Sequence, residues 1–154
     1  MMKQHFGWCS TRGRRSVVAR FVIVPLLAVV AGCASMGGGG GLTKDTPPEQ
    51  LQAKVQERAL ARWQALIDGA PERSYEYVSP ASKETVSLEA YRLSTQGVGV
   101  VYRKIEPDSV KCEGETCNVR VFLTYDHRIM RGIRAPMEEV WVLDKGQAWY
   151  VWRR

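Results

Sequence analysis

The feature that most constrains the fold is a change of hydrophobic period near Gly97. Before Gly97, apolar residues recur every three or four positions, which is the period of an amphipathic helix. After it, apolar and polar residues alternate, which is the period of a half-buried strand. Helices followed by strands are typical of the α+β class, and short connections between the strands favour an antiparallel sheet.

The first part of the chain predicts one long helix and shorter ones. We expect a helix over residues 48–68, with Thr46 as its N-cap and Glu49 as the acid of a capping box. Shorter helices are expected over 71–78 and 88–94, each after a proline or serine start signal. One face of the long helix carries the apolar stripe Leu51, Val55, Ala59, Trp63, Leu66, Ile67 and Ala70.

The second part predicts about five strands. Pro107-Asp108 is expected to form a turn, and the segment that contains Gly132 and Pro136 is expected to be a polar connection. One face of the third strand should hold Cys117, Val119, Val121, Leu123 and Tyr125. The expected strands are residues 98–106, 110–112, 117–126, 140–143 and 149–152.

Three local strings carry a family resemblance: Arg62–Leu66 (RWQAL), Tyr75–Ala81 (YEYVSPA) and Ser87–Tyr91 (SLEAY). They look like uncharacterised proteobacterial lipoproteins of the NTF2-like (cystatin-like α+β) superfamily. The resemblance implies N-terminal helices packed on a strongly curved antiparallel sheet, in a domain that spans residues 47–154. It implies no single function, because this fold carries enzymes, binders and scaffolds alike.

The N-terminal segment has the layout of a secretory signal. Basic residues precede the apolar run Phe21–Ala31, and as a helix this run rises only about 16 Å, too short for a hydrocarbon core of about 30 Å. The string Val30-Ala31-Gly32-Cys33 that follows resembles the lipobox of bacterial lipoproteins, although a plain secretory signal with an incidental Cys33 is the alternative.

The lipobox resemblance implies a cellular location and a lipid anchor. Residues 1–32 would be the signal peptide, and residues 33–46 a lipidated cysteine with a Gly-rich tether. Cys33 would carry diacylglycerol and an acyl chain such as palmitate on its new amine. Because no aspartate follows Cys33, we expect the periplasmic face of the outer membrane.

Charge and cysteines narrow the classes of partner. Five of the 22 Lys and Arg residues lie in the signal, leaving 17 against 16 acidic residues. A nucleic-acid binder should keep a basic surface after processing, so this class is discarded.

Cys112 and Cys117 flank a loop of common hairpin length and predict a disulfide in an exported domain. One mature histidine and no further thiols provide too few ligands for a zinc site, which takes four, and no cofactor is expected.

A concave sheet could hold a pocket lined by aromatic residues. Its candidate lining is Trp63, Tyr77, Tyr91, Tyr125, His127, Trp141 and Trp149. Trp63 is expected to plug the floor against Trp141 or Trp149. Ketosteroid isomerases of the superfamily use an acid with a tyrosine-type donor, and Asp126, His127 or Glu139 could supply the acid or base here. No motif fixes these residues to such roles.

The sequence therefore predicts a non-catalytic interaction or envelope-structural module. Its partners would be the membrane, through the lipid anchor, and an envelope protein. Arg128, Arg131 and Arg134 lie in one connection and could meet anionic headgroups or an acidic partner, although a solvated loop is the simpler interpretation. Alternatives are a small-ligand carrier, which needs an apolar cavity, and an enzyme, which needs that cavity with a buried acid.

Overall fold

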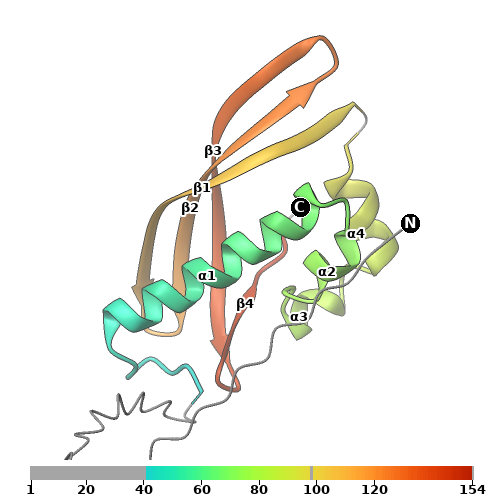
Figure 1. The fold of residues 1–154 in the computed structure, drawn as a ribbon. Coiled ribbons are helices and arrows are strands. Elements are labelled where there is room, and N and C mark those ends of the chain that lie inside the picture. Colours follow the sequence, from blue (N-terminus) through green and yellow to red (C-terminus); the bar gives the residue numbers. More distant parts are fainter. Residues whose placement is uncertain (1–40, 98, 154) are drawn as a thin grey trace, which may run out of the picture. The chain divides into compact units, whose positions relative to one another are not determined.

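The computed structural model describes residues 41–97 and 99–153, and the expected signal peptide and Cys33 lie outside this part. This part contains one long helix, three short helices and a four-stranded sheet. The helices are α1 (Pro48–Ile67), α2 (Pro71–Tyr75), α3 (Pro80–Lys83) and α4 (Leu88–Thr95). The strands are β1 (Val100–Glu113), β2 (Thr116–His127), β3 (Met130–Asp144) and β4 (Gln147–Tyr150). Figure 1 shows that β1, β2 and β3 are long and bent.

The long helix α1 matches its predicted range, but its N-terminus is built differently. Pro47 is the N-cap residue and makes no side-chain hydrogen bond to the helix. Thr46, the expected cap, instead accepts a hydrogen bond from the Thr43 backbone N–H at 2.9 Å. Pro48 suits the first turn because its missing N–H would have had no helical partner there.

The short helices begin at serine and proline start signals, including one at Ser79-Pro80 in addition to the two expected helices. Ser79 and Ser87 cap α3 and α4, each accepting a hydrogen bond from a backbone N–H three residues on. The predicted helix over 71–78 ends early, at Tyr75. Its last residues serve the sheet instead: the Tyr77 carbonyl accepts from the Tyr150 N–H at 2.8 Å, and Ser79 donates to the Tyr150 carbonyl at 2.8 Å. This pairing covers part of the free edge of β4.

The described strands form a four-stranded antiparallel sheet in the order β1-β2-β3-β4. The expected turn at Pro107 is wrong, because β1 runs through it with register shifts on either side of Arg103 and Asp108. The expected polar connection is also wrong, because β3 passes through Pro136. Prolines are tolerated where a strand has an open side. β1 is an edge strand, and β4 pairs only with Trp141–Asp144, so β3 has no neighbour on that side at Pro136.

Helix α1 crosses one face of the sheet and buries its apolar stripe there (Figure 1). The predicted alternation of β2 holds, since Cys117, Val119, Val121 and Leu123 all face this core. The core consists mainly of Leu51, Val55, Ala59, Trp63, Leu66, Val78, Tyr91, Cys117, Val119, Val121, Leu123, Trp141 and Ala148. The expected α+β class, with N-terminal helices packed on a curved antiparallel sheet, is confirmed.

The predicted disulfide closes the β1–β2 hairpin. Cys112 and Cys117 are opposite each other in the register, with Cα atoms 4.0 Å apart and the sulfur atoms bonded. The bond ties the edge strand β1 to β2 at the end where α1 begins (Figure 1).

The described end of the expected tether is docked on the domain. The Leu42 N–H donates to the Gly146 carbonyl at 2.8 Å, so this segment pairs with the β3–β4 turn. Gly41 and Gly146 pack backbone to backbone, because a Cβ on Gly41 would lie 2.4 Å from the Gly146 Cα. No helix among the described residues combines the length and apolar character needed to cross a membrane.

Candidate functional site

The concave side of the sheet, where a pocket was expected, is filled by side chains from α1 and the sheet. Trp63 is only 5 % exposed and packs edge-on against Tyr102, with ring centroids 5.6 Å apart. The expected contact partners of Trp63 were Trp141 or Trp149, whereas Trp141 packs against Tyr150 at 5.9 Å. The burial predicted for Trp63 is therefore found, but with a different neighbour.

A buried ion pair lies in this core, between α1 and β3. The Arg62 guanidinium donates to Glu139 Oε1, and both side chains are 3 % exposed. The other carboxylate oxygen of Glu139 accepts from the Trp141 indole N–H at 2.9 Å. Arg62 also donates to the Tyr91 hydroxyl at 2.9 Å, which in turn lies 2.6 Å from Ser74 Oγ. We call Arg62, Glu139, Tyr91, Ser74 and Trp141 the polar cluster.

Aromatic rings enclose the charged end of Arg62. Its guanidinium carbon lies 4.6 Å from the Trp63 ring centre and 4.2 Å from that of Tyr150. Burial alone disfavours the charged guanidinium, but the adjacent Glu139 carboxylate outweighs this effect and raises the pKa of Arg62. Burial raises the pKa of Tyr150 to about 12, although Arg62 acts in the opposite direction. The cluster thus holds one compensated pair of charges.

Arg62 is not among the expected site residues, because only apolar residues were assigned to the buried stripe of the helix. Its spacing gave a signal: Arg62 follows Ala59 by three residues and precedes Leu66 by four, so it lies on the apolar stripe itself. A basic residue inside such a stripe predicts a buried acid opposite, since a buried charge needs a partner.

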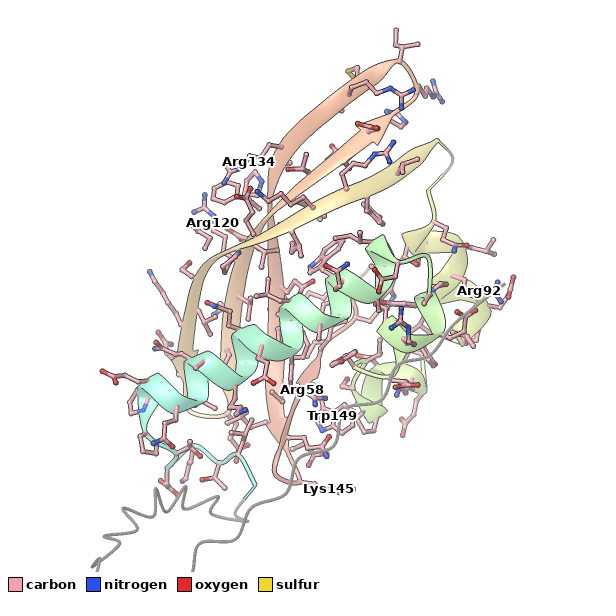
Figure 2. The ribbon with its side chains drawn as sticks, viewed as in Figure 1. Arg58, Arg92, Arg120, Arg134, Lys145 and Trp149 are labelled. Atoms are coloured by element: carbon pink, nitrogen blue, oxygen red, sulfur yellow. A yellow bond between two sulfur atoms is a disulfide. The ribbon has the colours of Figure 1, made fainter. Side chains whose placement is uncertain are left out.

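The expected pocket residues do not converge on one site. Trp63, Tyr91 and Trp141 are buried in the core. Tyr77 and Trp149 lie instead at the margin of the domain, where the Arg58 guanidinium is 5.0 Å and 5.5 Å from their ring centres. Figure 2 shows Arg58 and Trp149 close together beside β4. Tyr125 and His127 lie far along β2, near the end of the β2–β3 hairpin.

The two candidate acids of an enzyme are both neutralised by arginines. Glu139 is paired with Arg62 in the core. Asp126 is only 6 % exposed and accepts from the Gly132 N–H at 2.8 Å and from Arg103 Nε at 2.9 Å. Arg131 is a second cation on the same carboxylate, at 3.2 Å. The Gly132 amide and these arginines lower the pKa of Asp126, which makes it a poor proton donor or acceptor at neutral pH.

The hairpin that joins β2 and β3 extends as an arm beyond the end of α1 (Figure 1). We define the arm as residues 124–134 and its tip as residues 127–131. Ile129 at the apex is 95 % exposed and Met130 is 54 % exposed. Arg103, Arg131 and Arg134 lie behind this apex with exposed guanidinium groups. Ile129 and Met130 thus form a small exposed apolar apex with arginines behind it.

The outer face of the sheet carries a second group of arginines. Arg134 lies with its guanidinium carbon 3.6 Å from the Phe122 ring centre, and Arg120 lies 5.8 Å from the same ring. Figure 2 shows Arg120 and Arg134 next to each other on this side. Glu106 and Asp108 of β1 pair with these two arginines at 3.3 Å and 3.4 Å. This face is therefore a balanced network of ions rather than a basic patch.

The hollows of the described chain lie at its surface. The one between strands β1–β3 and the C-terminal segment has a volume of about 320 Å³, and its lining includes Lys111, Arg120, Glu138 and the arginine-paired Glu139. Another, of about 390 Å³, lies between α3 and β4 and includes Trp149. Residues 41–97 and 99–153 contain no group of three His, Cys, Asp or Glu side chains placed to hold a metal ion.

Comparison with known proteins gives only distant likenesses. No protein-family model matches the sequence, and no curated protein matches it. A SEC-C motif containing protein from Rhodopseudomonas palustris is similar in structure, with a TM-score of 0.49 and 11% identity over 67% of this chain and 80% of that one. An NTF2-like protein from Campylobacter jejuni, named provisionally as a transpeptidase, has a TM-score of 0.45 and 11% identity over 63% of this chain and 96% of that one. At such identity, function must be inferred from this chain's own residues.

Proposed function

We propose that this protein is an outer-membrane lipoprotein, anchored through Cys33, whose domain acts without catalysis as a binding module on the periplasmic side. The observation that carries the non-catalytic part is the filled concave side of the sheet. There Trp63, Trp141 and the Arg62–Glu139 pair occupy the place where an NTF2-like enzyme or carrier would hold its ligand.

The two alternatives lack what they need in the part of the chain that the structure describes. A small-ligand carrier needs an enclosed apolar cavity, but the hollows lie at the surface of the domain. An enzyme needs an acid free to exchange a proton next to a substrate space. Glu139 and Asp126 are instead held by arginines. A module that binds through its surface fits these observations best.

The anchor is tested by fractionating cells that express the wild-type chain or Cys33→Ser. We expect the wild-type protein in the outer-membrane fraction with an acyl mass on its N-terminal peptide, and Cys33→Ser released or retained elsewhere. Several acyl chains anchor firmly where one is marginal, so the difference should be large. Cys112→Ser with Cys117→Ser is the matched control, because it removes two cysteines and should leave the location unchanged. Wild-type protein without acyl mass would refute the anchor.

The non-catalytic role is tested at the polar cluster. If the cluster is purely structural, the paired substitution Arg62→Met with Glu139→Leu should yield a folded protein that complements a deletion strain as well as the wild type. An enzyme that used Glu139 would lose its activity in this variant even though it folds. Failure of the folded double variant to complement would therefore favour catalysis.

A further inference from the structure

The arm tip has the composition of an element that enters a lipid interface. Ile129 and Met130 form its apex and are largely exposed. Arg128 precedes them and Arg131 follows them in the sequence. This arrangement matches the layers of an anionic bilayer. The apolar apex would reach the acyl chains, and the cations behind it would lie at the level of the phosphates.

The tip is held in shape by its own contacts. Asp126 accepts from the Gly132 N–H and pairs with Arg131 and Arg103, so one carboxylate fixes both strands of the arm. Arg128 has a positive φ of 52°, and its backbone N–H donates to the Gly99 carbonyl at 3.1 Å. This end of the arm carries an excess of positive charge. Three arginines lie at the tip or beside it (Arg103, Arg128 and Arg131), whereas Asp126 supplies a single negative charge. A preorganised element loses little conformational entropy when it binds.

The small area of the apex favours a bilayer over a protein partner. A stable protein interface buries about 800 Å² on each side, far more than two side chains at a hairpin apex provide. Weak insertion is sufficient when an anchor already holds the domain at the membrane, because the second contact is then intramolecular.

The position of the tip sets how the domain would lie. Strand β3 runs from the tip to the turn that carries Gly146, where Leu42 docks. Its length from Met130 to Asp144 is about 45 Å at the usual rise per residue. The eight Cα-to-Cα steps from Cys33 to Gly41 reach at most about 29 Å. Both ends can therefore touch one bilayer when the long axis of β3 lies along the surface.

We propose that the arm tip, residues 127–131, inserts into the anionic headgroup region of the same membrane that holds the Cys33 anchor. This inference rests on the proposed lipid anchor and adds a second membrane contact to it. The domain then lies along the bilayer, and its other surfaces face the periplasm.

The test is hydrogen–deuterium exchange on the full-length protein in vesicles. Vesicles of phosphatidylcholine with about one-third phosphatidylglycerol, enough to make the surface anionic, are compared with vesicles of phosphatidylcholine alone. We expect slower exchange in peptides that cover residues 126–132 in the anionic vesicles, and loss of this protection at high salt because screening weakens the attraction. The acidic β1–β2 turn at Glu113–Thr116 is the internal control and should exchange equally in both.

Variants separate insertion from general attraction. Ile129→Ser with Met130→Ser removes the apolar apex and should abolish the protection, whereas Leu93→Ser, at a residue that is 72 % exposed on α4, should leave it intact. Equal exchange of the tip in both kinds of vesicle would overturn the proposal, as would protection that survives the double substitution. Protection that appears only with added envelope proteins would overturn it in favour of an acidic protein partner.

Failure of the anchor is recognised separately. If the wild-type protein does not float with either kind of vesicle, the lipid anchor is refuted. The tip is then measured with excess anionic vesicles added to the same protein. Protection there keeps the tip as a lipid-binding element, and its absence refutes both proposals.

Discussion

At the scale of single residues, the Arg62–Glu139 pair is the feature on which the interior depends most. Burying two charges costs several kcal/mol of desolvation, and their attraction offsets this only while both are present. Each member of the pair has a further hydrogen bond: Arg62 donates to the Tyr91 hydroxyl, and Glu139 accepts from the Trp141 indole N–H. The pair is therefore expected to be sensitive to the loss of one member and tolerant of the loss of both.

We predict that Glu139→Leu lowers the free energy of unfolding by about 3–5 kcal/mol, because it leaves the Arg62 charge buried without a partner. Adding Arg62→Met should restore most of the loss. Urea denaturation of the two variants measures this. The exposed pair Lys54–Glu57 is the control, and Glu57→Leu there should change stability by less than about 0.5 kcal/mol. A single variant as stable as the double variant would contradict the prediction.

Tyr150 gives a prediction for alkaline pH. Burial raises its pKa in the folded protein to about 12, from the ordinary value of about 10 for a tyrosine. The unfolded chain therefore loses this proton first, so the contribution to stability is complete below pH 10 and is lost as pH rises from 10 to 12. We expect the fall in the free energy of unfolding over this range to be smaller in Tyr150→Phe. Equal slopes for the two proteins would show that Tyr150 titrates normally.

The residue scale also shows where sequence reasoning stops. Trp63, Cys112 and Cys117 could be placed correctly, because burial of a large ring in an apolar stripe and pairing across a short loop are local properties. The partner of Trp63 could not be, since Tyr102 lies far along the sequence and meets Trp63 only when β1 packs on α1. The burial of Glu139 could not be predicted either. Glu138 and Glu139 are adjacent, and only the contact with Arg62, 77 residues away in the sequence, shows which of them faces the core.

At the scale of elements, helix α1 provides most of the packing that holds the sheet. It contacts β1, β2 and β4, and its stripe forms one side of the core. We predict that Trp63→Ala costs about 3–5 kcal/mol, as for other buried aromatic residues, against a total stability of about 5–15 kcal/mol for a domain. Urea denaturation at neutral pH measures the cost.

The matched control for this prediction is Leu93→Ala. Leu93 also lies on a helix, α4, but is 72 % exposed, so its truncation should change stability by no more than about 0.5 kcal/mol. If Trp63→Ala costs as little as Leu93→Ala, the ring is not part of the core and the packing of α1 described here is wrong.

The elements themselves were predictable to different degrees. Helix starts were found because serine and proline signals are local, and the β2 face was found because its alternation is uninterrupted. Strands β1 and β3 were predicted too short, since Pro107 and Pro136 were interpreted as breaks. Each proline is tolerated only because one side of its strand is open, and that depends on the strand order of the whole sheet.

At the scale of the whole molecule, the topology explains why the arm exists. β2 and β3 pair as far as His127 and Met130, whereas α1 ends at Ile67 and β4 pairs only with the far end of β3. At one end, the sheet therefore extends beyond helix α1. That end carries the arm tip, and the opposite end carries the disulfide and the docking site of Leu42.

The last prediction concerns where the folded domain begins. Gly146 has a φ of 79°, and a Cβ there would lie 2.8 Å from the Gly41 Cα, so Gly146→Ala should both strain the turn and displace the Leu42 segment. Gly114→Ala is the matched control: this turn glycine also has a positive φ, of 59°, but a Cβ there meets nothing within 4 Å. Both variants should lose about 1 kcal/mol from backbone strain, whereas Gly146→Ala alone should become more sensitive to trypsin after Lys44. Equal cleavage of the two variants would mean that the chain before α1 is not held by the β3–β4 turn, and that the tether extends to Pro48.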